Sequence, residues 1–285
     1  MTTEWQQETH ICKSCGNEFI GLYCNLCGEK VILAKDRKFK TFLGSVLIAT
    51  TIVDNKFIKS LWLIIKNPGF LSKEYVEGKR VRYMRPLQIF FILNLIYFLF
   101  PVLQMFNSSL FTQRYILPHG RLAQEIVQRK ITSEKIDIVA FEIMYNTKTT
   151  SLAKLLIVVF VLLASLPLSL IFLKKNRYFT DHVALSVELT CFNLAVNAVG
   201  LSIVFWLANK VLHWNAGGYD RYLNDLTLTI IFVSTNLYFL FRAAQTFYNQ
   251  KGKRLVIKAI GGILGLFFAL EIYRFILFFL TIWSL

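Results

Sequence analysis

The chain has 285 residues, of which 55% are hydrophobic, 15% aromatic and only 17% charged, and its mean hydropathy is +0.50. Ordinary soluble domains carry about 25% charged residues, so this composition argues against a soluble protein and predicts several membrane-spanning segments. The net charge of +15 would suggest a nucleic-acid partner only if the basic residues were gathered in one domain, and their distribution is different.

The excess of positive charge lies beside the apolar segments. Residues 1–38 hold five Lys or Arg and five Asp or Glu and are neutral, whereas residues 39–86 have a net charge of +6. Segments 174–182 and 242–258 contribute +2 and +5, so the three basic stretches carry 13 of the 15 excess charges. Basic residues next to apolar spans are typical of the cytosolic face of a membrane. We therefore expect anionic membrane lipids as partners and do not expect nucleic acid.

Four cysteines near the start of the chain predict a metal site. Cys12 and Cys15 form one CxxC pair, Cys24 and Cys27 form a second, and a glycine follows each pair. Four thiolates suit zinc, which accepts tetrahedral sulfur, and glycine tolerates the positive φ of a tight knuckle. A site with four protein ligands has no open position for catalysis, so the predicted Zn2+ has a structural role.

Three other chemistries use a similar pattern. Disulfides need an oxidising compartment, a redox CxxC normally opens a helix in a βαβ unit, and a rubredoxin-like iron site takes the same four ligands. Residues 1–38 are polar and contain neither a secretory signal nor a transit peptide, so we expect a cytosolic zinc ribbon head there, with reduced thiols. Cys191 lies alone in an apolar segment, where packing is its expected role.

Five segments are long and apolar enough to cross a hydrocarbon core about 30 Å thick, which takes about 20 helical residues. The expected spans are residues 86–106, 152–173, 183–208, 225–243 and 257–281. Pro86 suits the first turn of the first span. The predicted fold is an all-α polytopic protein of the cytoplasmic (inner) membrane. Its transmembrane domain covers residues 86–285, with the N-terminus in the cytosol and the C-terminus outside.

Two connecting regions are harder to interpret. Residues 41–53 and 61–65 are apolar but too short to span, and one span over both would bury charges at about 2.5–3.5 kcal/mol each. We therefore predict interfacial amphipathic helices and a basic collar over residues 39–85. The segment 107–151 is either an ordinary extracytoplasmic loop or a small helical element on the outer surface.

The basic collar has four cations within seven residues: Lys79, Arg80, Arg82 and Arg85. They could hold lipid phosphates or an acidic partner, or they could serve only to set the topology of the first span. Gly78 is expected to permit a turn just before that span.

Two motifs together resemble a known family. The string is Cys12-x2-Cys15-Gly16-x2-Phe19-x-Gly21-x-Tyr23-Cys24-x2-Cys27-Gly28, followed by Pro68-Gly69 and Glu74-Tyr75-x2-Gly78-Lys79-Arg80-x2-Tyr83-x2-Pro86. It is similar to an uncharacterised bacterial family of membrane proteins with an N-terminal zinc ribbon, common in Bacteroidetes-type genomes. The resemblance covers residues 12–100 by motif and implies zinc and several spans, but no activity. Many relatives have glutamine where this chain has Glu29.

Ionisable residues at membrane depth are functional candidates, because their burial in lipid is costly. Glu271 and Arg274 have the i, i+3 spacing of a helical ion pair, which is either structural or part of a gate. Glu188 lies about six residues, or about 9 Å, inside the third span, within reach of the cytosolic interface.

Asparagines form a second polar group at membrane depth. Asn193 and Asn197 are four residues apart on one helix face, and with Asn94 and Asn236 they could line a polar seam. Interhelical hydrogen bonding is the alternative explanation for such residues.

These observations favour a non-enzymatic scaffold or regulatory protein whose cytosolic zinc ribbon docks a protein partner. The first alternative is a small transporter or channel with Glu188, Asn193, Asn197, Glu271 and Arg274 along its path. The second is a membrane-embedded enzyme that acts on lipid and holds a head group with the collar. The chain has no phosphate-binding loop, dinucleotide fingerprint or GxSxG motif.

Overall fold

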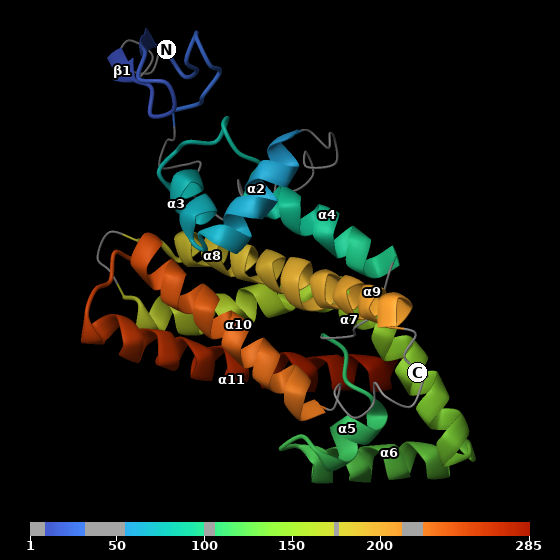
Figure 1. Cartoon of the computed structure of the whole chain (residues 1–285). Helices are drawn as coiled ribbons and strands as arrows, with labels where there is room; N and C mark the ends of the chain where they lie inside the picture. The colour runs from blue at the N-terminus through green and yellow to red at the C-terminus, as the bar shows by residue number, and fades with distance from the viewer. Residues whose placement is uncertain (1–8, 32–54, 100–105, 174–176, 213–224) are drawn as a thin grey trace, which may run out of the picture.

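A small β ribbon forms the start of the described chain, and helices form nearly all of the rest (Figure 1). The computed structural model describes residues 9–31, 55–99, 106–173, 177–212 and 225–285. In Figure 1 the ribbon lies beyond helices α2 (Asn55–Lys66) and α3 (Phe70–Val76), on the side away from the long helices. The structure is therefore mostly helical, as predicted.

The ribbon is built on a two-stranded antiparallel sheet. Strand β1 (Thr9–Ile11) pairs with β2 (Glu18–Ile20), and His10 lies opposite Phe19. Because side chains alternate between the faces of a strand, Phe19 points inward and is buried against two of the cysteines. This small cluster is separate from the core of the helical body, so the ribbon depends on its own contacts for its shape.

Among the described residues, three helical segments are long and apolar enough to cross a membrane: Ile138–Ile171, Phe179–Val204 and Lys253–Ser284. The first is α7 and the third is α11. The second lies in a continuous helical run of α8 (Phe179–Phe192), the π-helix η3 (Asn193–Gly200) and α9 (Leu201–Leu212).

Large apolar side chains cover the outer faces of α7 and α11. On α7 they recur every three or four residues, at Leu155, Val158, Leu162, Leu166 and Leu170, and all five are exposed. A stripe of this kind is unfavourable in water and is satisfied by lipid chains. The helices therefore indicate a membrane protein.

Two of the five predicted spans are not confirmed. Helix α4 (Pro86–Leu99) begins at the expected proline, but it has 14 residues and is too short to be a candidate span. Residues 100–105 of that prediction lie outside the described residues. Helix α10 (Asp225–Thr246) has 22 residues but is not among the candidate spans.

The segment 107–151, expected to be either an ordinary loop or a small helical element, is largely helical. It contains α5 (Leu110–Tyr115), α6 (Gly120–Glu134) and the first part of α7, which begins 14 residues before the predicted span. Asp137 starts α7 early, because its carboxylate accepts a hydrogen bond from the Val139 N–H at 3.0 Å. The prediction missed this start because residues 138–151 are only partly apolar.

The first turns of α7 pack against the end of α11. Phe141 and Tyr145 are fully buried, and the Tyr145 ring lies 6.1 Å from that of Phe278. Helix α6 closes this end, since Lys130 Nζ donates to the Ile282 carbonyl at 2.8 Å. A cation at a helix C-terminus stabilises the unpaired carbonyls there.

Glycines in α11 allow close packing of the long helices. A Cβ added at Gly265 would overlap the ring of Pro167 in α7, and one at Gly262 would lie 3.0 Å from Leu240 in α10. Gly261 has more space, with only an ordinary contact to Ile171 at 3.8 Å. Small residues at such crossings let helix backbones approach each other inside a membrane.

Two turns meet at one end of the body. The rings of Phe172, after α7, and Tyr248, after α10, are stacked with centroids 4.1 Å apart. Arg177 reaches across and donates to the Phe247 carbonyl at 3.1 Å, and His182 Nδ1 lies 2.6 Å from the Tyr248 hydroxyl oxygen. These contacts place Arg177, which precedes α8, at the same end of the body as the turn between α10 and α11.

Helices α2 and α3 pack on the body. Residues 39–54 of the predicted interfacial region lie outside the described residues, and residues 55–85 contain α2, α3 and the collar. The end of α2 is held by α10, where the Tyr238 hydroxyl donates to the Ile65 carbonyl at 3.2 Å. Gly69 has φ +82°, and a Cβ there would lie 2.9 Å from the Cα of Ala243. This close approach explains the glycine of the Pro68-Gly69 motif.

Candidate metal centre and its docking site

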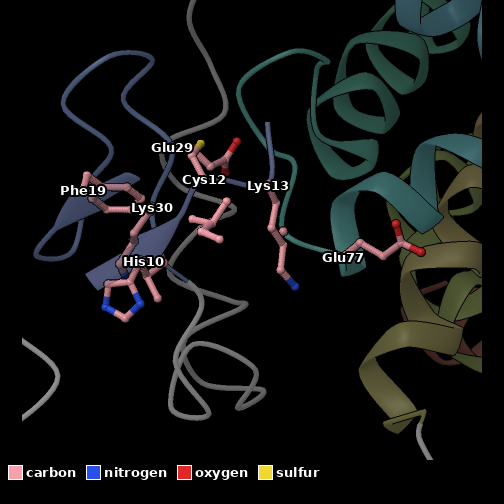
Figure 2. Close-up of a pocket in the computed structure, with 10 residues that line it drawn as sticks. His10, Cys12, Lys13, Phe19, Glu29, Lys30 and Glu77 are labelled. Carbon is pink, nitrogen blue, oxygen red and sulfur yellow. The ribbon is translucent and has the colours of Figure 1, made fainter. Parts of the chain in front are cut away.

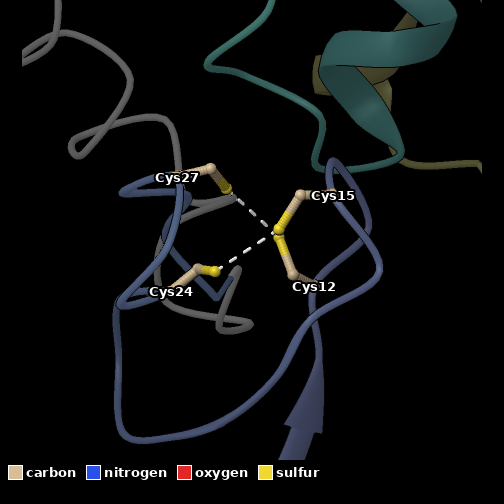
Figure 3. Close-up of side chains that lie close together, drawn as sticks. All are labelled: Cys12, Cys15, Cys24 and Cys27. Atoms are coloured by element: carbon tan, nitrogen blue, oxygen red, sulfur yellow. Dashed lines mark hydrogen bonds between the residues drawn. The ribbon is translucent and has the colours of Figure 1, made fainter.

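The four N-terminal cysteines converge on one point (Figure 3). The Sγ atoms of Cys12 and Cys27 are 3.4 Å apart, those of Cys15 and Cys24 are 3.6 Å apart, and all four lie within 4.8 Å of one another. A tetrahedral ion with sulfur ligands at about 2.3 Å separates them by about 3.8 Å. The cluster therefore has the size of a four-sulfur metal site.

Backbone hydrogen bonds shape both knuckles. The N–H of Gly16 donates to the Cys12 carbonyl at 2.8 Å, and that of Gly28 donates to the Cys24 carbonyl at 2.9 Å. The two glycines have φ of +78° and +74°, in the left-handed region where a side chain would be strained. The predicted reason for a glycine after each CxxC pair is confirmed.

The local field favours the thiolate at one cysteine and opposes it at another. Burial opposes ionisation of Cys24, but hydrogen bonds from the N–H groups of Cys27 and Leu26 and from neighbouring thiols lower its pKa to about 6. At Cys27 the N–H of Glu29 favours the thiolate, but burial and the other cysteines raise its pKa to about 12. Four thiols this close cannot all ionise without a cation among them, so the donor set fits a metal ion.

Glu29 attaches the ribbon to the rest of the chain. Its carboxylate is only 4% exposed and accepts hydrogen bonds from the N–H of Arg80 at 2.9 Å and the N–H of Val81 at 3.1 Å. Ser14, inside the first knuckle, donates its hydroxyl to the same carboxylate at 2.7 Å. The Glu29 carbonyl accepts from the Cys24 N–H at 2.8 Å, inside the second knuckle. One residue thus contacts both knuckles and the collar.

A cleft of about 180 Å³ lies beside this contact (Figure 2). On the ribbon side it is lined by His10, Lys13, Phe19 and Lys30, and Glu77 lines it from the end of α3. Figure 2 shows Lys13 and Glu77 on the side of the cleft that faces the collar. Because both signs of charge are present, the lining favours no single kind of ligand.

The collar cations do not form one uniform set. Lys79 Nζ pairs with Glu74 at 2.7 Å and with Glu77 at 3.6 Å, and the pairing with Glu74 raises the pKa of the lysine. Arg80 lies over the Tyr75 ring at 4.6 Å and Arg82 over the Tyr83 ring at 5.7 Å. Lys79 is thus paired within the protein, whereas the guanidinium groups of the three arginines form no ion pair among the described residues. Gly78 makes the expected turn, with φ +100°.

Glu188 lies inside the helical body of the protein. It is fully buried, and its two carboxylate oxygens accept hydrogen bonds from the Gly69 N–H at 2.9 Å and the Ser72 N–H at 2.7 Å. These N–H groups are the unpaired donors at the start of α3, which also carry the positive end of the helix dipole. Glu188 therefore caps a helix that lies more than 100 residues earlier in the chain.

The asparagines form interhelical hydrogen bonds. Asn193 in η3 and Asn236 in α10 exchange two amide hydrogen bonds, each 2.9 Å long, and Asn197 donates to Asn193 at 2.8 Å. Asn94 is not part of this group and donates to the Lys154 carbonyl at 3.3 Å. The polar seam of four asparagines is therefore reduced to three, which bond one another.

The remaining candidates have local partners. Glu271 and Arg274 form the predicted i, i+3 ion pair, with a distance of 3.2 Å. Two further atoms of this pair, Glu271 Oε2 and Arg274 Nε, are buried without a hydrogen-bond partner among the described residues. Cys191 is buried, and its Sγ lies 3.5 Å from the Pro86 carbonyl, in keeping with the packing role expected of it.

Sequence reasoning missed the docking role of Glu29 and the capping role of Glu188, although it named Glu188 as a candidate. Glu29 is adjacent to the second knuckle, but its partners in the collar, Arg80 and Val81, lie 51 and 52 residues away, so no local pattern marked its role. The capping role of Glu188 had no local signal, because its partners lie 116 and 119 residues away.

Fold and site together define a helical membrane protein with a four-cysteine head that contacts its first helices. Residues 54–98 match the model of a family described as "Protein of unknown function (DUF3667)". The matched stretch contains α2, α3, the collar and nearly all of α4. No curated protein and no solved structure matches the chain.

Proposed function

We propose that this chain is a non-enzymatic scaffold or regulatory protein of the cytoplasmic membrane, with a structural zinc ribbon that binds a protein partner in the cytosol. The observation that carries the proposal is the Glu29 contact, because it fixes the ribbon on the collar and leaves its other face open. A ribbon held in this way presents a surface of constant orientation to a partner.

The donor set supports zinc as the metal. Four thiolates and no carboxylate or open position suit a closed structural site, and zinc takes this geometry without a redox change. The ligands would be Cys12, Cys15, Cys24 and Cys27. The ion would supply the cross-link that such a short segment needs, since its own apolar cluster is very small.

Exposed apolar side chains support the partner-binding role. The ribbon leaves four large residues more than half exposed, namely Ile11, Ile20, Tyr23 and Leu26. Apolar side chains at this density on so small a segment are typical of an interaction surface. A cytosolic position is supported by the basic segments that meet at one end of the body.

The transporter alternative receives less support. Asn193, Asn197 and Asn236 bond one another directly, and Glu188 is occupied by backbone donors. Residues that satisfy each other in this way serve helix packing better than they serve a path for ions or solutes.

The proposal is tested by affinity purification of the full chain with metal analysis. We expect Cys12→Ser with Cys24→Ser to lose zinc and the captured partner. Ile20→Ser with Leu26→Ser should keep zinc but lose the partner, and Cys191→Ser should keep both. Full zinc retention in the double-cysteine variant would contradict the metal assignment. Equal partner capture by the Ile20/Leu26 variant would contradict the interaction surface.

A further inference from the structure

The outward face of α2 and the adjoining collar combine apolar and cationic side chains. We call this the α2–collar surface, which consists of Ile58, Lys59, Trp62, Lys66, Arg80 and Arg82. Ile58 and Trp62 are 68% and 60% exposed, one helical turn apart, and Lys59 and Lys66 are exposed on the neighbouring strip of the same helix. An apolar strip beside a cationic strip is the pattern of a helix that lies at a membrane interface.

No ion pair among the described residues involves a cation of the α2–collar surface. Lys79 pairs with Glu74 and Glu77, and the Glu29 carboxylate accepts from the backbone N–H groups of Arg80 and Val81. Lys59 Nζ and the guanidinium of Arg82 both lie over the ring of Tyr83, at 5.5 Å and 5.7 Å. Two cations are therefore held around one buried aromatic ring, and no described acidic side chain forms an ion pair with either.

The surface is also fixed in shape. The buried Ser60 hydroxyl, on the inner face of α2, accepts a hydrogen bond from the Met84 N–H at 3.0 Å, and so ties the collar to α2. Tyr83 packs edge-on against Phe70 of α3, with ring centroids 5.7 Å apart. Cations that are already in place lose little conformational freedom when they bind an anion.

We infer that the α2–collar surface binds the phosphate groups of anionic phospholipids. Lys59, Lys66, Arg80 and Arg82 contact the phosphates, while Ile58 and Trp62 enter the boundary between head groups and acyl chains. A bilayer fits better than an acidic protein, because α2 packs directly on α8, which belongs to a candidate span. The inference is independent of the ribbon's metal and partner.

Quenching of Trp62 by brominated lipids tests the inference. The full chain is reconstituted with Trp62 as its sole tryptophan, after Trp5, Trp206, Trp214 and Trp283 are changed to Phe. Brominated phosphatidylglycerol or brominated phosphatidylcholine is then titrated into a phosphatidylcholine bilayer. We expect half-maximal quenching at a lower mole fraction of the anionic lipid. In the double variant Lys59→Gln with Arg82→Gln, the mole fraction of anionic lipid at half-maximal quenching should rise roughly fivefold for each cation removed.

The matched control is Arg121→Gln with Arg129→Gln, which removes two exposed cations from α6 and should leave the half-point unchanged. Equal half-points for the two lipids in the parent protein would overturn the inference. So would an equal shift in the control variant, which would mean that only net charge matters. Absence of quenching by either lipid would show that α2 lies away from the bilayer and would overturn it as well.

Discussion

Glu188 shows how one buried carboxylate can hold two distant parts of a chain. A charge without partners inside a membrane protein would be strongly destabilising, and here two backbone N–H groups at the start of α3 compensate it. In return, the carboxylate accepts hydrogen bonds from N–H groups that have no acceptor within the seven-residue helix α3. Burial and capping therefore depend on each other at this residue.

Removal of this carboxylate should destabilise the folded protein. We expect Glu188→Ala to lower the free energy of unfolding by about 2–4 kcal/mol, because two buried N–H groups lose their acceptor. Glu188→Gln should cost less, since one acceptor oxygen remains. Thermal unfolding in detergent measures both, with Glu125→Ala on the exposed face of α6 as the control. A Glu188→Ala protein as stable as the control would contradict the capping role.

Position 265 requires glycine because Pro167 of α7 lies too close for a side chain, and not because of its backbone conformation. Gly265→Ala should destabilise the protein by about 1–3 kcal/mol, because the new methyl group overlaps Pro167. Gly261→Ala, one turn earlier in α11, should be neutral or stabilising, since it meets only an ordinary contact and alanine favours helix. Unfolding of the two variants in the same detergent checks the difference, and equal stabilities would argue against close packing of α7 on α11.

At the scale of elements, the α5–α6 unit is attached to the body through a histidine. His119 Nε2 lies 2.7 Å from the Gln113 side-chain oxygen, and its ring packs edge-on against Phe275 with centroids 5.2 Å apart. Burial lowers the pKa of His119, although the charge of Glu271 acts in the opposite direction. The neutral ring is therefore the form that the folded unit prefers.

This preference predicts weaker docking of α5 and α6 in acid. The unfolded segment binds a proton near pH 6.5, above the folded pKa, so stability present above that pH is lost as the pH falls below it. Hydrogen exchange over residues 110–134, corrected for intrinsic rates, should show faster opening at lower pH. His119→Gln keeps a partner for Gln113 but does not titrate, and it should remove this pH dependence. An unchanged pH profile in that variant would exclude His119 as the cause.

How much could be predicted differs from element to element. The cysteine pairs, their glycines and the start of α4 follow from short-range rules, because knuckle geometry and proline chemistry involve only neighbouring residues. The early start of α7 was missed because its first turns bury aromatic residues against α6 and α11, which hydropathy along the sequence does not record. The docking role of Glu29 and the capping role of Glu188 were missed for the same reason, since their partners are 51 and up to 119 residues away.

At the scale of the whole molecule, the ribbon and the body have separate cores joined by a few hydrogen bonds. Removal of the metal with a chelator should therefore unfold the ribbon and leave the helices folded. Hydrogen exchange should become faster over residues 9–31. It should also become faster at the N–H groups of Arg80 and Val81, which lose their acceptor Glu29, but it should not change in α8. Glu29→Ala should expose Arg80 and Val81 while the ribbon stays folded. Loss of protection throughout α8 after chelation would contradict two independent cores.

The long-range contacts of Glu29 and Glu188 also determine the order in which parts of the chain fold. The ribbon is the first described part of the chain to be synthesised, and it can close around a metal with local contacts alone. Its docking partner, the collar, follows α3, whose start remains uncapped until Glu188 has been made. A contact between residues 119 positions apart forms late. The entropy cost of closing the intervening chain must be met before the contact can stabilise the protein. The segment synthesised first is thus among the last to reach its final position, and until then its knuckles and exposed side chains are open to other proteins.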